Sequence, residues 1–164
     1  MSPDDIPLLF RHNARNLRRR ELAGFLRRIA RGRSVTCLLT GDRELRRLNR
    51  RFLGRNYAAD VLSFPGGNGG EIAISLDRAA AQAKERGHGI AEEVRILMLH
   101  GVLHLSGYDH ESDSGEMARA ERRWRKRLGL PLGLIERTVN QPPPDERERP
   151  RSARKRAASR GRKP

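Results

Sequence analysis

Hydrophobic and polar positions in the first part of the chain change between helical and strand-like spacing. Residues 16–31 place leucine, phenylalanine and isoleucine side chains at helical spacing with arginines on the other faces, which predicts a basic amphipathic helix. Residues 34–40 are mainly β-branched or aliphatic and predict a strand, and a second helix is expected to follow from about Asp42. Two short apolar runs at 61–64 and 71–75 predict two further strands, joined by a flexible glycine-rich loop.

The second half of the chain is predicted to be mainly helical. Ser75 can cap the first of these helices. Residues 91–105 are apolar on nearly all faces, which indicates a central helix that is buried on most sides. A last helix is expected to begin at Ser112 or Ser114 and to end at Gly129. Strands in the first half and helices in the second predict an α+β domain with a small mixed β-sheet covered by helices.

Composition changes near residue 141, where a run of prolines opens a stretch without an aliphatic pattern. We therefore expect one folded domain over residues 1–138 and a disordered basic tail over residues 139–164. The chain has 35 Lys and Arg against 20 Asp and Glu, a formal net charge of +15. Nine basic and three acidic residues give the tail +6, so the folded part carries the other +9.

This charge changes the expected class of partner. A strongly basic surface attracts polyanions, which makes nucleic acid or an anionic membrane the first expectation. Aromatic residues make up only 4% of the chain, which favours contact with nucleic acid through its phosphates. Residues 96–105 form the longest apolar stretch, which contains two histidines and falls short of the roughly 20 residues that span a bilayer.

Export and disulfide bonding are disfavoured as well. Cys37 is the only cysteine, so no intrachain disulfide can form, and a reducing compartment is expected. The first residues are acidic where an export signal needs positive charge. These features predict a cytoplasmic protein without a membrane partner.

Three of the five histidines lie within eleven residues. His100 and His104 are four positions apart, so on a helix both imidazoles project from one face, about one turn apart. Gly107 allows the chain to turn out of the helix in a left-handed conformation, and His110 can then return as a third ligand. This spacing predicts one Zn²⁺ ion, and three protein ligands leave a fourth position for water, which is typical of a catalytic zinc site.

The same spacing occurs in the long zinc-protease motif, but one residue differs. Gly101 stands where those proteases carry the glutamate that acts as general base, which makes a protease the less favoured hypothesis. Because glycine costs a helix about 1 kcal/mol relative to alanine, we expect the missing side chain to leave space beside the metal. His12 and His88 are expected to lie in the core or at the surface without a metal.

The segment 100–110, HGVLHLSGYDH, resembles the signature of the YbeY family, bacterial single-strand endoribonucleases of rRNA maturation and ribosome quality control. The segment 60–65, DVLSFP, is similar to a second family motif and follows residues 48–54 at the family's spacing. The Gly-Glu-Ile sequence at 70–72 is similar to the strand that follows in the family. The resemblance extends over residues 34–130.

This resemblance implies a zinc-dependent, single-strand-specific endoribonuclease that acts in 16S rRNA 3′-end maturation and late-stage 70S ribosome quality control. The implied cofactor is one Zn²⁺ on His100, His104 and His110. The implied partners are rRNA, single-stranded RNA and the ribosome.

One departure from the family pattern leaves two functions open. Leu53 occupies the position of a family arginine that is implicated in RNA cleavage, so Arg50 or Arg55 is expected to hold the phosphodiester instead. The alternative is a ribosome-associated maturation factor with a mainly structural zinc and little cleavage activity.

Acidic residues near the histidines are candidates for supporting roles. Asp109 stands beside His110 and is expected either to accept the ring N–H of that histidine or orient another ligand, or simply to cap a helix. Glu71, Glu111 and Asp113 are candidate proton carriers, since carboxylates can act as general acids and bases. The sequence assigns none of them as the general base.

Overall fold

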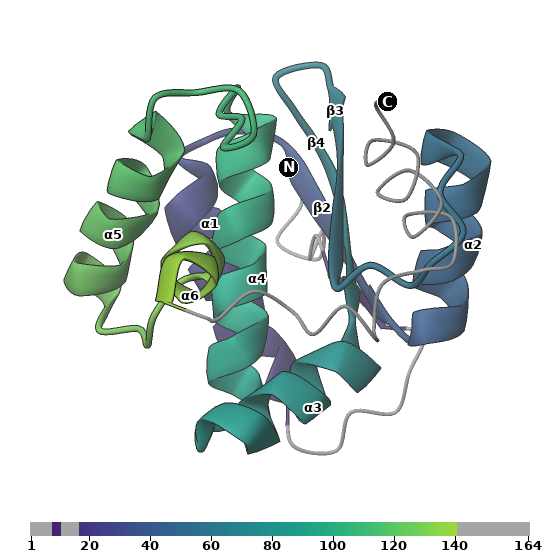
Figure 1. Cartoon of the computed structure of the whole chain (residues 1–164), viewed down its shortest axis with the longest axis horizontal. Helices are drawn as coiled ribbons and strands as arrows, with labels where there is room; N and C mark the ends of the chain where they lie inside the picture. Colours follow the sequence, from purple (N-terminus) through teal and green to yellow (C-terminus); the bar gives the residue numbers. More distant parts are fainter. Residues whose placement is uncertain (1–7, 11–16, 141–164) are drawn as a thin grey trace, which may run out of the picture.

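A four-stranded β-sheet separates the helices into two layers (Figure 1). The computed structural model describes residues 8–10 and 17–140, with side chains as far as residue 137. The strands are β1 (Leu8–Phe10), β2 (Val35–Thr40), β3 (Val61–Gly66) and β4 (Gly69–Ser75). They lie in the order β1-β2-β4-β3; β1, β2 and β4 are parallel, and β3 pairs antiparallel with β4 at one edge.

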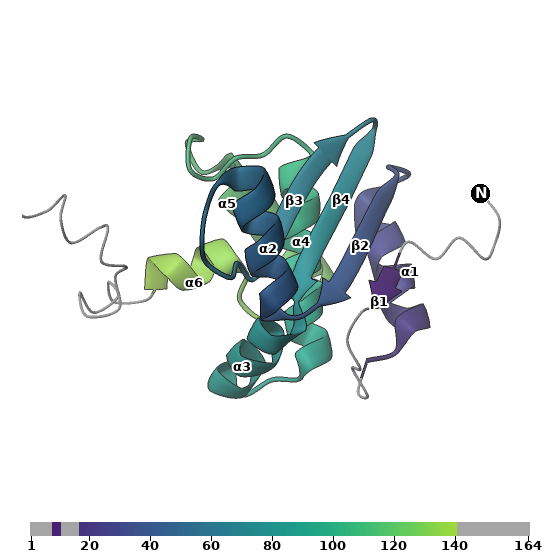
Figure 2. The same cartoon turned by 90° about the vertical axis from the view of Figure 1, so that its right-hand side faces the viewer.

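The helices cover both faces of this sheet. Those in the described part of the chain are α1 (Arg19–Ala30), α2 (Asp42–Leu53), α3 (Leu76–Arg86), α4 (Ile90–Leu105), α5 (Glu116–Leu128) and α6 (Leu134–Asn140). Helix α4 packs against β3 and β4 and also contacts α1, α3, α5 and α6. Figure 2 shows α2 in front of the sheet and α4 behind it. The α+β class, the mixed sheet and the central buried helix are therefore confirmed.

Side chains on the two faces of β4 enter two different cores, because successive residues of a strand point to opposite sides. Ile72 and Ile74 belong to the main core, which includes the buried side chains of α1 and α4. Ala73, which lies between them, packs with Leu45 of α2 and Leu62 of β3 in a smaller core on the other face. The alternation within one short strand thus holds α4 and α2 on opposite sides of the sheet.

Gly101 permits the close approach of α4 to the sheet. A Cβ atom added at this position would lie 2.9 Å from Cγ2 and 3.0 Å from Cδ1 of Ile72. On the neighbouring strand, the Ser63 hydroxyl donates to the Gly101 carbonyl oxygen at 3.2 Å. The expectation that the missing side chain leaves space beside a metal is therefore wrong, since that space is filled by Ile72.

Two capping expectations have different outcomes. Ser75 caps α3 as expected, because its hydroxyl accepts from the Arg78 amide at 3.2 Å. At the start of α5, neither Ser112 nor Ser114 is the cap. The Asp113 carboxylate accepts from the amides of Gly115 and Met117 instead, both at 2.8 Å.

Four elements differ from the sequence prediction. β3 and β4 extend into the expected flexible loop and leave a tight hairpin between Gly66 and Gly69. Strand β1 and helix α6 were not expected from the local pattern. Both are short, and β1 forms by pairing with β2 rather than through a periodicity of its own.

Helix α6 ends at Asn140, two residues beyond the expected domain boundary at 138. Most of the expected basic tail, residues 141–164, lies outside the described residues, as does His12. No helix in residues 8–10 and 17–140 is long and apolar enough to cross a membrane.

Candidate metal centre

Three histidine side chains converge at the end of α4. His100 and His104 come from its last two turns, and His110 comes from the loop that follows. Each offers a ring nitrogen, and these atoms lie within 4.8 Å of one another. His100 is buried, His104 is half-buried and His110 is exposed, so the cluster opens to solvent on the His110 side.

The loop after α4 brings His110 back toward the helix. Gly107 has a φ of +95°, a left-handed conformation that residues with a side chain rarely adopt. The Tyr108 amide then donates to the Leu103 carbonyl oxygen at 3.2 Å and keeps the chain against the last turn of α4. These local contacts agree with the turn that the glycine predicts.

Two of the imidazoles are held through their Nδ1 atoms. His100 Nδ1 lies 3.1 Å from Oε2 of Glu121, and His104 Nδ1 lies 3.0 Å from the Tyr108 carbonyl oxygen. Both partners accept a hydrogen bond, which favours the tautomer that carries its proton on Nδ1 and leaves Nε2 free as a ligand. Three imidazoles with two rings oriented in this way fit a zinc-type ion.

Glu121 is the functional side chain that the sequence analysis missed. It lies on α5, is 1% exposed, and accepts from the Ile135 amide through Oε1 at 3.0 Å. Gly133 allows this arrangement, because a Cβ atom there would overlap the Glu121 carboxylate. A signal was present, since Glu121 follows Met117 by four positions and places a carboxylate on the apolar face of α5.

The surroundings of His104 favour its neutral form. Burial lowers the pKa of His104, and the neighbouring His100 and His110 lower it further. The hydrogen bond to the Tyr108 carbonyl and the charge of Asp109 oppose this shift but do not reverse it. His104 therefore stays unprotonated, as a metal ligand must be, to a lower pH than an ordinary histidine.

The Asp109 carboxylate stabilises the loop. Its oxygens accept from the Ser112 hydroxyl at 2.8 Å and from the Glu111 amide at 3.1 Å. These hydrogen bonds lower the pKa of Asp109. Within the described residues these contacts stabilise a turn, and Asp109 neither caps a helix nor forms a hydrogen bond with His110.

The other acidic candidates lie in different settings. Asp113 is engaged as the cap of α5, and its pKa is lowered by the amides of Met117 and Gly115. Glu71 is exposed on β4, and Glu111 is exposed in the loop beside the histidines. Neither is hydrogen-bonded to a histidine in the described part of the chain.

The expected RNA-binding residues, Arg50 and Arg55, lie in another layer of the fold. Arg50 is exposed in the last turn of α2, and Arg55 follows that helix and donates to the Tyr57 hydroxyl at 3.4 Å. Helix α2 covers the face of the sheet opposite to α4, so neither arginine belongs to the layer that carries the histidines (Figure 2). Leu53, close to both in sequence, is 48% exposed.

Comparison with known proteins identifies the family. A family model described as Endoribonuclease YbeY matches residues 11–129. The chain belongs to the YbeY family. This membership confirms the resemblance noted from the histidine segment, and it confirms the expectation that the chain is a nuclease of the hydrolase class.

Individual YbeY relatives extend the match over most of the chain. The Endoribonuclease YbeY of Solibacter usitatus is 57% identical over 142 residues, which covers 83% of this chain and 97% of the relative. That of Koribacter versatilis is 56% identical over 108 residues, 64% of this chain and 71% of the relative. The fold also resembles the solution structure of a Thermotoga maritima protein, with a TM-score of 0.54 and 23% sequence identity. The match covers 85% of this chain and 99% of the Thermotoga chain, and it supports the fold alone.

Proposed function

We propose that this YbeY-family protein is a metal-dependent endoribonuclease that hydrolyses single-stranded RNA. Its role would be the maturation of the 16S rRNA 3′ end and late-stage quality control of the 70S ribosome, in the cytoplasm. One Zn²⁺ would be held by His100, His104 and His110. The observation that carries the proposal is the convergence of these three imidazoles, two of them oriented through Nδ1.

The ligand set favours zinc and an open coordination position. Three imidazoles are the donor set of several catalytic zinc sites, and the exposed side of the cluster at His110 admits a substrate. A divalent ion in such a site acts as a Lewis acid and activates water near neutral pH. The chain's own contribution is to hold the ligands: Glu121 orients His100, and the Tyr108 carbonyl orients His104.

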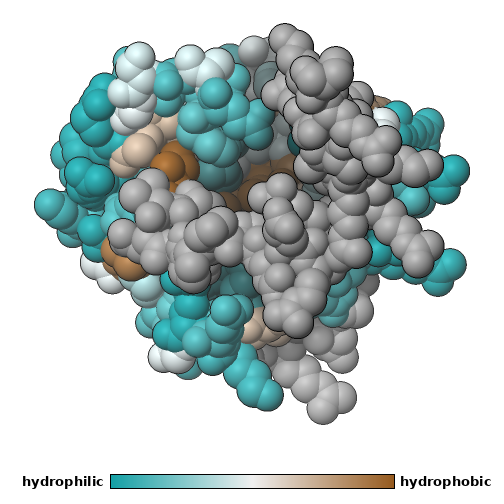
Figure 3. Space-filling view, viewed as in Figure 1, coloured by the Kyte–Doolittle hydropathy of each residue, from teal (hydrophilic) through white to brown (hydrophobic). Residues whose placement is uncertain are grey.

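The surface supplies attraction for the substrate. Apart from the atoms in grey, most residues visible in Figure 3 are hydrophilic, and hydrophobic side chains show in a few separate places. The net charge of +15 draws RNA phosphates to such a surface in a salt-dependent manner. Arg50 and Arg55 would contribute from the α2 layer.

A second candidate function is a ribosome-associated maturation factor whose metal is mainly structural. Two observations favour it: Leu53 stands at the position of the family arginine, and Arg50 and Arg55 lie apart from the histidine layer. Against it stands the exposed side of the cluster, because structural zinc sites are usually closed by a fourth protein ligand.

One cleavage assay separates the two. Full-length protein loaded with zinc is incubated with a single-stranded fragment that spans the 3′ end of 16S rRNA, and with the same fragment annealed to its complement. We expect cleavage of the single strand only, and loss of both cleavage and bound zinc in His104→Ala. The control is Lys84→Ala, which changes an exposed residue of α3 outside the cluster. Binding of the fragment without cleavage by the zinc-loaded wild type would favour the second candidate.

A further inference from the structure

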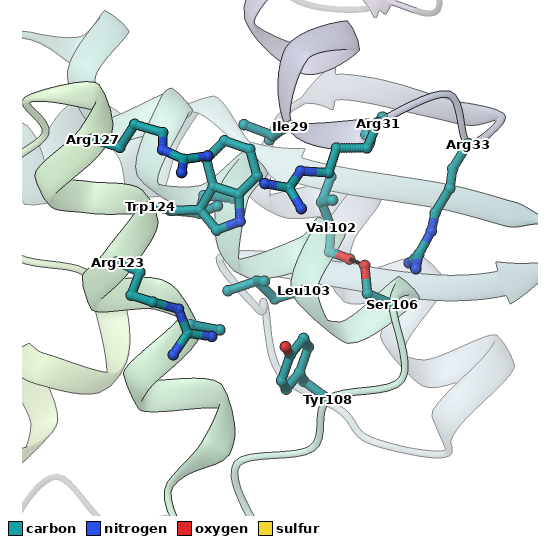
Figure 4. Close-up of a pocket in the computed structure, with 13 residues that line it drawn as sticks. Ile29, Arg31, Arg33, Val102, Leu103, Ser106, Tyr108, Arg123, Trp124 and Arg127 are labelled. Atoms are coloured by element: carbon teal, nitrogen blue, oxygen red, sulfur yellow. Dashed lines mark hydrogen bonds between the residues drawn. The ribbon is translucent and has the colours of Figure 1, made fainter.

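A pocket distinct from the histidine cluster lies between α1, α4 and α5 (Figure 4). Its volume is about 350 Å³, and apolar side chains of α4 line its base. Figure 4 shows arginines approaching it from two sides, from the connection after α1 and from α5. The four arginines that line the pocket are Arg31, Arg33, Arg123 and Arg127.

None of these four guanidinium groups forms an ion pair within the part of the chain that the structure describes. The contrast with their neighbours is clear. Arg125 of α5 pairs with Glu136 at 3.0 Å, and Arg119 pairs with Glu116 at 3.8 Å. The pocket therefore carries uncompensated positive charge. Because it is concave, the surrounding protein strengthens the positive electrostatic potential there, which attracts anions.

Trp124 gives the pocket a second kind of contact. The Arg31 guanidinium lies 4.7 Å from the centre of the Trp124 ring, and that of Arg127 lies 5.6 Å from it. Both distances are within the range of cation–π contact. These contacts keep both guanidinium groups beside the indole, and the N–H donors of a guanidinium in such a contact remain able to bind phosphate oxygens. An arginine-covered aromatic ring is also a surface on which a nucleobase can stack.

The pocket shares one residue with the metal centre. The Tyr108 side chain lines the pocket, and the carbonyl oxygen of the same residue accepts from Nδ1 of His104. His110 follows Tyr108 by two positions. A ligand in the pocket would therefore lie beside the segment that carries the histidine cluster.

We propose that this pocket binds one nucleotide of the single-stranded RNA substrate, away from the bond that is cut. Its phosphate would contact Arg31, Arg33 and Arg123, and its base would stack on the Trp124–Arg31 pair. A pocket of about 350 Å³ lies at the lower end of the range for small-ligand sites, which runs from about 300 to 1,000 Å³. This inference rests on the proposed function, which supplies RNA as the substrate.

Trp124 is the only tryptophan, so its fluorescence reports directly on the pocket. The full-length protein is titrated with adenosine 5′-monophosphate, which has no internucleotide bond to cleave, and separately with adenosine and with inorganic phosphate. We expect saturable quenching by the nucleotide and at least about tenfold weaker binding of either part alone, because charge and stacking act together. Absence of quenching, or equal affinity for phosphate alone, would overturn the proposal.

Paired variants locate the site. Arg31→Gln with Arg123→Gln removes two charges from the pocket, and the control Arg28→Gln with Lys84→Gln removes two charges from exposed positions outside it. The pocket variant should bind the nucleotide about tenfold more weakly, since each phosphate contact is charge-assisted, and the control should be unchanged. Equal losses in both variants would show a general charge effect and overturn the proposal.

Cleavage of the single-stranded rRNA fragment tests the connection to the substrate. Relative to the wild type, the pocket variant should have a KM about tenfold higher and a kcat within about twofold. The slope of log affinity for RNA against log salt concentration should become less steep by about 1.4, because two charges are removed. An unchanged KM would overturn the assignment to the RNA substrate. If the wild type did not cleave RNA but the nucleotide still quenched Trp124, the proposed function would fail and the nucleotide site would stand.

Discussion

Glu121 Oε2 lies 3.1 Å from Nδ1 of His100, although the two residues are 21 positions apart and on different helices. Both side chains are buried. The contact joins α5 to α4 at the histidine cluster, and the second oxygen of the same carboxylate accepts from the Ile135 amide. One buried carboxylate therefore fixes an expected metal ligand and ties the start of α6 to the same place.

Glu121→Gln should weaken metal binding while the fold is retained. The glutamine side chain has a similar shape but lacks the negative charge. That charge makes the His100 imidazole a stronger electron-pair donor to a metal. The loss of such a partner typically lowers metal affinity by about 10- to 100-fold. Zinc affinity is measured by competition with a chelator. The control is Glu116→Gln, which changes an exposed glutamate of the same helix. Equal zinc affinity in the two variants would show that the carboxylate does not support the metal.

Gly101→Ala should destabilise the protein. The added methyl group meets Ile72 at 2.9 Å, and overpacking of this kind costs about 1–3 kcal/mol. Alanine gains about 1 kcal/mol in helix propensity, so we expect a net fall of up to about 2 kcal/mol in the free energy of unfolding. Urea denaturation measures the change.

Gly24→Ala is the matched control for that substitution. Gly24 is exposed in α1, and no atom lies within 4 Å of a Cβ added there. Helix propensity alone should raise the free energy of unfolding by about 0.5–1 kcal/mol. If both substitutions raised the free energy of unfolding, the result would contradict the close packing of α4 on the sheet.

Glu93→Gln tests the buried ion pair that anchors α6. Arg137 donates two hydrogen bonds to Glu93, at 2.6 and 2.8 Å, and the His88 ring contacts the same carboxylate. The substitution leaves the Arg137 charge buried without its partner, which should lower the free energy of unfolding by about 3–5 kcal/mol at pH 7. Glu92→Gln, one position away and without an ion pair in the described part of the chain, should change it by less than about 0.5 kcal/mol.

The effect of Glu93→Gln should depend on pH. Burial raises the pKa of Glu93, but hydrogen bonds and charges from Arg137 and His88 outweigh it and hold the pKa below its ordinary value. A carboxyl with a lowered folded-state pKa stabilises the fold at neutral pH, and this stabilisation is lost as the pH falls through that pKa. The difference between wild type and variant should therefore narrow below about pH 4.3, the ordinary value for glutamate. A difference that stays constant through this range would contradict the ionised pair.

Removal of residues 141–164 tests the expected basic tail. The deletion takes away +6 and leaves +9 on the rest of the chain. RNA binding should weaken and its salt dependence should become less steep, because fewer phosphates are neutralised. Binding should persist through the remaining charge. Affinity for single-stranded RNA at several salt concentrations measures this, and complete loss would make the tail the sole RNA anchor.

Features of the fold that depend on near neighbours could be predicted from the sequence. The periodicity of residues 91–105 indicates helix α4, and the four-residue spacing of His100 and His104 puts both on one face of it. The return of His110 depends on Gly107, only three positions before it. Local geometry sets all of these relations, so the candidate metal ligands follow from one short segment.

Contacts between distant segments could not be predicted in this way. Glu121 reaches His100, Arg137 reaches Glu93, and Ile72 fills the space at Gly101 only because the sheet order and the packing of α5 and α6 bring them together. The arginines of the Trp124 pocket likewise come from two segments that lie far apart in the chain, the connection after α1 and helix α5. A periodic pattern shows which face of a helix or strand is apolar, but it does not show against which other element that face packs. The partner of each buried charge is therefore decided when the layers pack.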